Sequence, residues 1–245
     1  IAAATGAALF CDPFAPRLER GAGRVVVERL PYFAEQLVEA LAPFEQLVLV
    51  GSTPPVAFFA YPGKPSWCSP EGADILHLAH PHEDGVGALA ELADLVGGDG
   101  TGAVAPWEVP DHPSGRFDQF TIGQVIARLL PEGAIVSDEA ATSGLGSAIA
   151  HATAAPHDVL SLTGGAIGQG LPLAAGASVA CPDRKVVCLH GDGGAMYTVQ
   201  ALWTMAREQL DVTTVIFANR SYGILNIELQ RVGADAGPQA LSMLD

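Results

Sequence analysis

The sequence has few basic residues. Its 245 residues include 12 Lys and Arg against 27 Asp and Glu, a formal net charge of −15, and the basic residues form no cluster along the chain. A chain of this charge repels polyanions, so nucleic acid is not expected as a partner. Any phosphate that the chain binds must be held by helix N-termini, backbone N–H groups or a bridging metal ion.

Cysteine and long apolar runs are also scarce. The four cysteines, at 11, 68, 181 and 188, include no Cys-x-x-Cys pair, which argues against a zinc site and a disulfide framework and favours a reducing cytoplasm. The apolar run at 171–181 is interrupted by Pro, Gly and Ser and is far shorter than the ~20 residues that span a bilayer. Since 49% of the residues are hydrophobic, we expect a cytoplasmic globular protein with a large core.

The two ends of the sequence resemble internal segments of a longer protein. The chain starts at Ile1, without Met and without the charged segment of a signal peptide. Residues 237–245 run into apolar residues with no polar tail. We therefore expect the sequence to be a fragment.

Short apolar runs alternate with helical patterns in the first part of the chain. Strands are expected at 46–51 and 74–78, and helices at 32–41 and 85–96. Residues 97–116 concentrate Gly, Pro and polar residues, which is typical of a linker. These patterns predict a domain at 1–96, a linker at 97–116 and a second domain at 117–245.

The second part continues the alternation. The expected helices lie at 121–130, 142–150, 170–180 and 196–209, with Thr121 as the first N-cap, and the expected strands lie at 134–137, 185–190 and 212–218. Strand, helix, strand in this order implies right-handed crossovers and a parallel sheet. The predicted fold class is α/β, with two parallel-sheet units of which the second is doubly wound.

Two predicted strand ends carry the residues that indicate chemistry. Asp192 lies in the run His-Gly-Asp-Gly-Gly after one strand, and Asn219 follows the next. Adjacent parallel strands end at the same edge of a sheet, where α/β proteins bind ligands. The Asp192 carboxylate, the Asn219 amide oxygen and the Ser221 carbonyl suit Mg²⁺, which prefers oxygen ligands. The helix expected from about Met196 points its N-terminus at the same place.

Taken alone, Gly-Asp-Gly-Gly is an ordinary tight turn. Combined with Ala-Leu-Trp at 201–203 and Asn-Arg-Ser-Tyr-Gly at 219–223, the sequence resembles the cofactor domain of thiamine-diphosphate enzymes of the acetolactate synthase, benzoylformate decarboxylase and pyruvate decarboxylase superfamily. The family signature is Gly-Asp-Gly followed by Asn, usually Asn-Asn. Here Ala218 stands in place of the first Asn, and Asn219 aligns with the metal-binding second one.

This resemblance implies a thiamine diphosphate site with Mg²⁺ held by Asp192, Asn219 and Ser221. The turn after the strand expected at 185–190 is expected to bind the cofactor through Gly191, Gly193, Gly194 and Ala195. Tyr222 is expected either to offer its hydroxyl to the diphosphate or only to pack.

The resemblance extends upstream through most of 117–230. Leu-Thr-Gly-Gly-Ala-Ile-Gly-Gln-Gly-Leu-Pro at 162–172 is similar to the family loop that meets the aminopyrimidine ring, which implies that the Gly165 carbonyl accepts a hydrogen bond from the 4′-amino group and that Ile167 bends the cofactor. In isolation this loop would be a Gly-rich turn with one core Ile. Residues 137–143 resemble the turn whose backbone, at Ala141 and Thr142 here, touches the diphosphate; a plain N-cap is the competing and compatible account.

Residues 1–96 resemble, more weakly, the C-terminal part of the family's middle domain. Some members bind FAD there, and FAD remains possible, but no motif in this stretch indicates it. The stretch 56–62 is comparable to the one that supplies an active-site His in benzoylformate decarboxylase and contains no His, which argues against a close copy of that enzyme. The histidines lack ligand-like spacing and are expected at the surface or at strand ends; six of them are at 77, 80, 82, 151, 157 and 190.

By resemblance, the expected function is Mg-dependent 2-keto acid decarboxylation with carboligation or release, as in acetolactate synthase. In the family a Glu of the pyrimidine domain protonates the cofactor, and that domain is not in these residues. No catalytic residue is therefore assigned here, the isolated chain is expected to be inactive, and a homodimer or homotetramer formed through a pyrimidine domain is implied.

Three alternatives stay open. One is a non-catalytic or separately encoded cofactor-binding subunit, and another is a benzoylformate decarboxylase-like lyase. The last is a nucleotide- or phosphate-binding module, which would need Gly-x-Gly-x-x-Gly or a P-loop Lys; neither is present.

Overall fold

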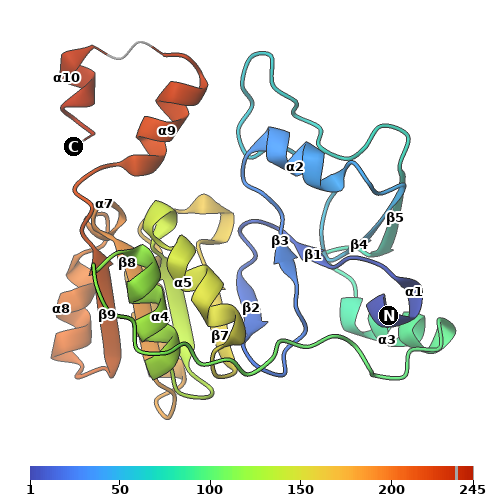
Figure 1. The fold of residues 1–245 in the computed structure, drawn as a ribbon, viewed down its shortest axis with the longest axis horizontal. Helices are drawn as coiled ribbons and strands as arrows, with labels where there is room; N and C mark the ends of the chain where they lie inside the picture. The colour runs from blue at the N-terminus through green and yellow to red at the C-terminus, as the bar shows by residue number, and fades with distance from the viewer. Residues whose placement is uncertain (235–236, 245) are drawn as a thin grey trace. The chain divides into compact units, whose positions relative to one another are not determined.

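A computed structural model describes residues 1–234 and 237–244 of the chain. The structure separates into two units, drawn in Figure 1: one contains Ile1–Pro13 and Val26–Ala103, and the other contains Phe14–Val25 and the chain from Val104 onward. The division between Ala103 and Val104 falls within the predicted linker at 97–116, but the segment Phe14–Val25, which contains β2, belongs to the second unit rather than to the predicted domain at 1–96.

The first unit contains two small parallel sheets, β1 with β3 and β4 with β5, as expected for an α/β unit. Its elements are α1 (Ala2–Thr5), β1 (Phe10–Cys11), β3 (Glu28–Arg29), α2 (Ala34–Leu41), β4 (Gln46–Val50), β5 (Asp74–Ala79) and α3 (Gly85–Leu95). The helix α2 turns Leu37 and Leu41 inward, where they pack with Leu30 and Cys68. Burying such side chains stabilises this unit by about 1.5–3 kcal/mol for each Leu.

The second unit is a five-stranded sheet in the order β2-β7-β6-β8-β9, parallel except for β2. Its elements are β2 (Arg17–Arg20), α4 (Gln119–Leu129), β6 (Ile135–Glu139), η1 (Ala141–Ser143), α5 (Leu145–Ala150), η2 (His151–Thr153), β7 (His157–Ser161), η3 (Thr163–Gly165), α6 (Gly170–Ala180), β8 (Val186–Gly191), α7 (Asp192–Ala195), α8 (Gln200–Arg207), β9 (Val212–Phe217), α9 (Gly223–Arg231) and α10 (Pro238–Leu241).

Both faces of this sheet are covered. Successive side chains of a strand point to opposite faces, so each parallel strand contributes to two packed clusters. Val136 and Leu189 pack on one face with Leu130, which follows α4. On the other face, Ile135 and its neighbours pack against α6 and α8 in a cluster formed by Ile135, Leu171, Ala174, Val186, Cys188, Ala195, Ala201 and Met205. The predicted α/β fold class is confirmed.

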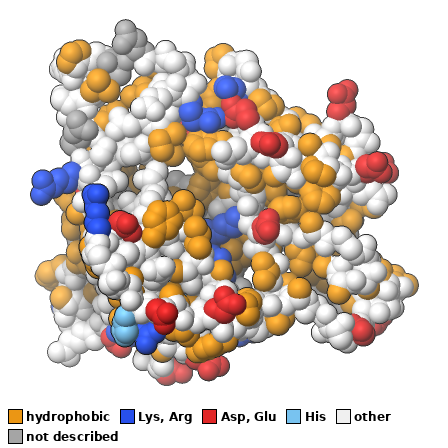
Figure 2. All heavy atoms as spheres, in the orientation of Figure 1, with side chains coloured by type: hydrophobic (Ala, Val, Ile, Leu, Met, Phe, Trp, Pro, Cys, Tyr) orange, Lys and Arg blue, Asp and Glu red, His pale blue; other side chains and the backbone are white. Residues whose placement is uncertain are grey.

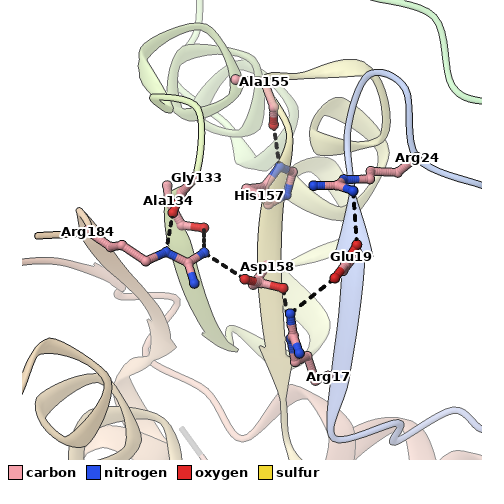
Figure 3. A network of polar contacts seen from close by, with 9 residues as sticks. All are labelled: Arg17, Glu19, Arg24, Gly133, Ala134, Ala155, His157, Asp158 and Arg184. Carbon is pink, nitrogen blue, oxygen red and sulfur yellow. Dashed lines mark hydrogen bonds and ion pairs between the residues drawn. The ribbon is translucent and has the colours of Figure 1, made fainter. Parts of the chain in front are cut away.

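An ion-pair network secures β2 at the amino end of the sheet. In Figure 3, Asp158 of β7 lies between two arginines: its Oδ1 accepts from Arg17 Nε of β2 at 2.8 Å, and its Oδ2 accepts from an Arg184 guanidinium nitrogen at 2.6 Å. Arg184 Nε also donates to the Gly133 carbonyl at 2.5 Å. Strands β2 and β7 were not expected from the sequence, since three of the four residues of β2 and three of the five residues of β7 are polar or charged.

Several predicted helix ends differ from the structure, and the starts of α4 and α8 differ in what they imply. Asp118, rather than Thr121, caps α4, and Thr121 completes the reciprocal capping box as its third residue. The helix expected from about Met196 begins at Gln200 instead, and the short α7 precedes it. The helical turn nearest the proposed cation ligand is therefore α7.

On the face drawn in Figure 2, the Lys and Arg side chains occupy separated positions among hydrophobic and acidic ones. Among the helices of the described residues, none has the length and apolar character to cross a membrane.

Candidate functional site

Strands β8 and β9 end side by side. They are parallel neighbours, with Gly191 opposite Phe217. Asp192 comes directly after β8, as the first residue of α7, and Asn219 lies two residues beyond β9. The structure thus places the two loops that carry these side chains at one edge of the sheet, as the predicted strand order required.

Asp192 joins the two loops through hydrogen bonds. Its Oδ2 accepts the backbone N–H of Arg220 at 2.9 Å, across 28 residues of sequence, and its Oδ1 accepts the N–H of Gly193 at 3.0 Å. Arg220 adopts φ +56°, which is uncommon for a residue with a side chain. Each carboxylate oxygen retains a lone pair, so Asp192 can hold the second loop and still accept a further ligand.

The second loop is ordered by its own polar groups. Asn219 Oδ1 accepts the Ser221 N–H at 3.1 Å, and Ser221 Oγ accepts from Asn226 Nδ2 of α9 at 3.0 Å. A side chain at Gly223 would come within 3.1 Å of Thr142 Oγ1 and 3.8 Å of Asn219 Nδ2. The turn after β6, which contains Ala141 and Thr142, therefore meets the loop that contains Asn219.

Tyr222 packs directly on the turn after β8. A Cβ atom at Gly193 would lie 2.7 Å from Tyr222 Cε1, so only glycine fits there. The Tyr222 residue is 40% exposed. Packing of the ring is thus observed, and a role for its hydroxyl stays a prediction.

The loop after β7 is shaped by glycines in the left-handed region. Gly164, Gly165 and Gly168 have φ of +61°, +70° and +91°. Ile167 in this loop is 52% exposed. The alternative that Ile167 is a core residue is therefore wrong. The next residue, Gly168, contacts the segment between α7 and α8, where Thr198 Oγ1 donates to the Gly168 carbonyl at 2.7 Å.

Glu139 and His190 form a buried pair beneath these loops, which the sequence reasoning missed. Their side chains are 3% and 0% exposed, and Glu139 Oε2 lies 3.0 Å from His190 Nε2. Glu139 Oε1 accepts the Gly168 N–H at 2.5 Å, and Oε2 accepts the Gly170 N–H at 2.6 Å. Their place in the sequence could have indicated the pair, because Glu139 is the last residue of β6 and His190 is the last but one of β8.

These contacts keep Glu139 ionised. Burial alone would raise its pKa, but the His190 imidazole and the N–H groups of Gly168 and Gly170 together lower the pKa below its ordinary value. On the same strand as His190, burial and the negative charge of Glu139 raise the pKa of Cys188 to about 12. The Cys188 thiol is therefore protonated at neutral pH and packs as an apolar group.

The donor set beside Asp192 is oxygen-based. Within the described residues, no group of three or more His, Cys, Asp and Glu side chains is placed to hold a metal ion. A cation here would use the Asp192 carboxylate, the Asn219 amide oxygen and a backbone carbonyl, together with oxygens of a ligand. That chemistry suits Mg²⁺, which is commonly held by one or two carboxylates and substrate phosphates.

Residues 141–240 match a family model described as "Thiamine pyrophosphate enzyme, C-terminal TPP binding domain"; thiamine pyrophosphate is another name for thiamine diphosphate. Over its whole length the chain is 52% identical to a Mycobacterium tuberculosis protein named "Putative acetolactate synthase large subunit IlvX", of which it covers 48%. The acetolactate synthase isozyme 1 large subunit of Escherichia coli is 34% identical over 111 residues, which are 45% of this chain and 20% of that protein.

Solved structures agree in fold. A thiamine diphosphate-dependent 4-hydroxybenzoylformate decarboxylase of Rhodococcus jostii RHA1 superposes with a TM-score of 0.71 at 22% identity, covering 96% of this chain and 47% of that one. At this identity the likeness shows the fold alone. The chain spans about half the length of the Mycobacterium tuberculosis protein that it matches.

Proposed function

We propose that the chain, whose residues 141–240 match a thiamine pyrophosphate enzyme family model, provides the diphosphate- and Mg²⁺-binding part of an acetolactate synthase-like enzyme. The proposed reaction is decarboxylation of a 2-keto acid, followed by transfer or release of the remaining fragment. One observation carries the proposal: the hydrogen bond of 2.9 Å from the Arg220 N–H to Asp192 Oδ2. It joins the two loops on which the ligand set depends.

Each predicted residue has a proposed task. Mg²⁺ would be held by Asp192, Asn219 and the carbonyl of Ser221. The diphosphate would be held by Ala141, Thr142, Gly191, Gly193, Gly194, Ala195 and Tyr222. The aminopyrimidine would contact the Gly165 carbonyl and the Ile167 side chain. The oxygen donors beside Asp192 fit a hard cation, and the bound cation compensates for the shortage of basic side chains in a chain of net charge −15.

When bound, thiamine diphosphate supplies an electron sink for cleavage of the bond to the carboxylate. The chain's own residues bind and orient. Asp192 and Asn219 hold the cation that neutralises the diphosphate, and the exposed apolar side chain of Ile167 excludes water from one side of the site, which strengthens the polar interactions within it.

The proton donor to the pyrimidine ring is proposed to come from a different domain. Glu139 is unsuited to that task, since its side chain is 3% exposed and both oxygens accept backbone N–H groups. We expect residues 1–245 expressed alone to turn over neither pyruvate nor benzoylformate, because positioned acid–base catalysis contributes about 10²–10⁴-fold. A homodimer or homotetramer formed through a pyrimidine domain is part of this proposal, as is the cytoplasm as the location.

Calorimetry tests the cofactor and the metal together. Thiamine diphosphate is titrated into the 245-residue chain with Mg²⁺ and then with EDTA. We expect binding that weakens sharply with the chelator, because Asp192 and the diphosphate oxygens would both be ligands of Mg²⁺. Equal affinity with and without Mg²⁺ would contradict the metal assignment, and no binding in either case would contradict the proposed function.

A turnover assay addresses the alternatives. A separately encoded cofactor-binding subunit would bind thiamine diphosphate and gain activity on addition of a complete pyrimidine domain. A non-catalytic chain would bind and stay inactive with that partner. Comparing acetolactate with free aldehyde as the product from pyruvate would then distinguish carboligation from simple decarboxylation.

A further inference from the structure

The pair Glu139 and His190 connects three of the four segments proposed to hold the cofactor and its cation: the end of β6, the loop after β7 and the turn after β8. We propose that these two are positioning residues: they hold the loop of residues 163–170, which is proposed to meet the aminopyrimidine, in register with the turn that begins at Asp192. This inference rests on the proposed function for the identity of the ligand. Its structural part, that the pair orders the loop, stands on contacts alone.

Glu139 holds the loop through its backbone. One carboxylate oxygen accepts the Gly168 N–H at 2.5 Å and the other accepts the Gly170 N–H at 2.6 Å. Charge-assisted hydrogen bonds of this kind are about twice as strong as neutral ones. A second bond fixes the same place, since Ser137 Oγ donates to the Gly170 carbonyl at 2.8 Å. Two residues of β6 therefore determine where the loop ends and α6 begins.

His190 fills the space between the loop and the turn. A side chain at Gly170 would come within 2.7 Å of His190 Cδ2, and one at Gly194 would lie 3.0 Å from both His190 Cε1 and Glu139 Oε1. The ring is thus enclosed between a glycine of each segment. Its Nδ1 lies 3.0 Å from the Gly191 carbonyl, and its Nε2 lies 3.0 Å from Glu139 Oε2. A shift of the ring would displace both segments.

The partners of Glu139 separate positioning from general stability. The buried Asp158 carboxylate accepts hydrogen bonds from the side chains of Arg17 and Arg184 at the opposite end of the sheet. The Glu139 carboxylate accepts hydrogen bonds from backbone N–H groups of the loop beside the site. A misplacement of about 1 Å at a cofactor site is costly to its function. Loss of the Glu139 carboxylate should therefore change the order of the loop and ligand binding, and loss of the Asp158 carboxylate should change stability.

Hydrogen–deuterium exchange of the ligand-free chain tests the structural part. In Glu139→Gln, one of the two loop amides faces an NH₂ group instead of an oxygen. We expect exchange in residues 163–171 to rise at least ~10-fold, the loss expected from about 1.5–3 kcal/mol per charged hydrogen bond. The matched control, Asp158→Asn, leaves protection of this segment at its original level under conditions where both variants are folded. Equal protection in Glu139→Gln and the unchanged chain overturns the proposal.

Two ligands test the positioning of the cofactor. Glu139→Gln should lose ~10–100-fold in affinity for thiamine diphosphate. Its affinity for inorganic pyrophosphate with Mg²⁺, which needs the proposed diphosphate and Mg²⁺ ligands but not the loop of residues 163–170, should change less than ~3-fold. Parallel loss of both affinities overturns positioning and makes the pair a general support of the fold. If the unchanged chain binds neither ligand, the proposed function fails, and the exchange result still decides the structural part.

His190 provides a second pair of variants if Glu139→Gln does not fold. His190→Gln keeps a donor toward Glu139, whereas His190→Leu removes it at similar volume. We expect the Gln variant to retain loop protection and thiamine diphosphate affinity within ~5-fold and the Leu variant to lose both, by the same ~10–100-fold. Identical behaviour of the two variants overturns the role given to the His190 contact.

Discussion

The two ends of the five-stranded sheet use carboxylates in different ways. At the amino end, Asp158 pairs with the guanidinium groups of Arg17 and Arg184 and so ties β2 and the segment before β8 to β7 (Figure 3). At the carboxyl end, Glu139 and Asp192 accept backbone N–H groups from loops. Side-chain partners hold elements together, whereas backbone partners determine the shape of a loop.

Most of the backbone strain lies at the carboxyl end. Among the described residues, Ala141, Arg220 and Gln209 are the non-glycine residues with positive φ; the first two lie in segments that converge on the proposed site, and Gln209 lies before β9 at the amino end. Residues with such φ cost about 1–3 kcal/mol and persist where the surroundings determine their conformation. The amino end is thus expected to govern stability and the carboxyl end ligand binding. Four predictions test this contrast.

The largest expected effect is that of Asp192→Ala on cofactor binding. The variant loses the carboxylate proposed to hold Mg²⁺, so thiamine diphosphate affinity should fall more than ~100-fold, beyond the 10–100-fold typical of residues that only support a metal ligand. Calorimetry in the presence of Mg²⁺ measures this change. Asp211→Ala, at the amino end and 74% exposed in its side chain, is the control and should bind normally; normal binding by Asp192→Ala would assign the metal to other residues.

The next effect is that of Asp158→Asn on stability. Removing the charge leaves two arginines partly buried without their partner, so the free energy of unfolding should fall by about 2–3 kcal/mol; Arg17, with 58% of its side chain exposed, contributes the smaller share. Urea titration followed by circular dichroism gives this value. If cofactor affinity, measured below the unfolding midpoint, falls together with stability, the proposed division of roles between the two ends of the sheet is wrong.

As the pH falls, the buried His151 at the amino end should lower stability before the stabilisation by Asp158 is lost. Burial, with smaller contributions from His157 and Arg20, lowers the pKa of His151 to about 3, against about 6.5 in the unfolded chain. Between these values only the unfolded chain binds the proton, so stability falls as the pH drops below about 6.5. His151 alone should cost about 2 kcal/mol by pH 5.

The variant His151→Phe removes this proton site while keeping a planar ring. Stability measured between about pH 7 and pH 5 should then fall less steeply, by roughly one proton's share of the slope. His82→Phe, on an exposed residue, is the control and should keep the original slope. The pKa of Asp158 is lowered, because the hydrogen bonds from Arg184 and Arg17 outweigh burial, so its stabilisation persists above about pH 4 and is lost only below.

The smallest effect is that of Ala141→Gly. Since Ala141 has φ +49°, glycine relieves the strain of a left-handed conformation and should raise stability by up to about 1 kcal/mol. Ala148→Gly, inside α5, should instead lower stability by about 1 kcal/mol. Thermal unfolding of the two variants compares them directly. A loss of stability in both would show that Ala141 is not strained.

The sequence predicted the structure correctly where apolar runs marked two neighbouring parallel strands. The Asp192 and Asn219 loops were expected at one sheet edge, because parallel strands β8 and β9 are clear apolar runs, and they lie there. The prediction failed where polar residues occupy strands. β2 and β7 contain Arg17 and Asp158, which pair with each other across 141 residues of sequence, and Asp158 also pairs with Arg184, 26 residues away.

The sequence by itself determined the α/β class, the apolar strands and the Gly-Asp-Gly and Asn signature, since all of these follow from local composition and spacing. Only the tertiary structure decided the rest. It placed the segment Phe14–Val25 in the sheet of the other unit, and it buried Glu139 and His190 as a pair beneath the site. The physical reason is that an ionised group is tolerated in a core only when partners from other segments reach it, and no window of the sequence contains both partners.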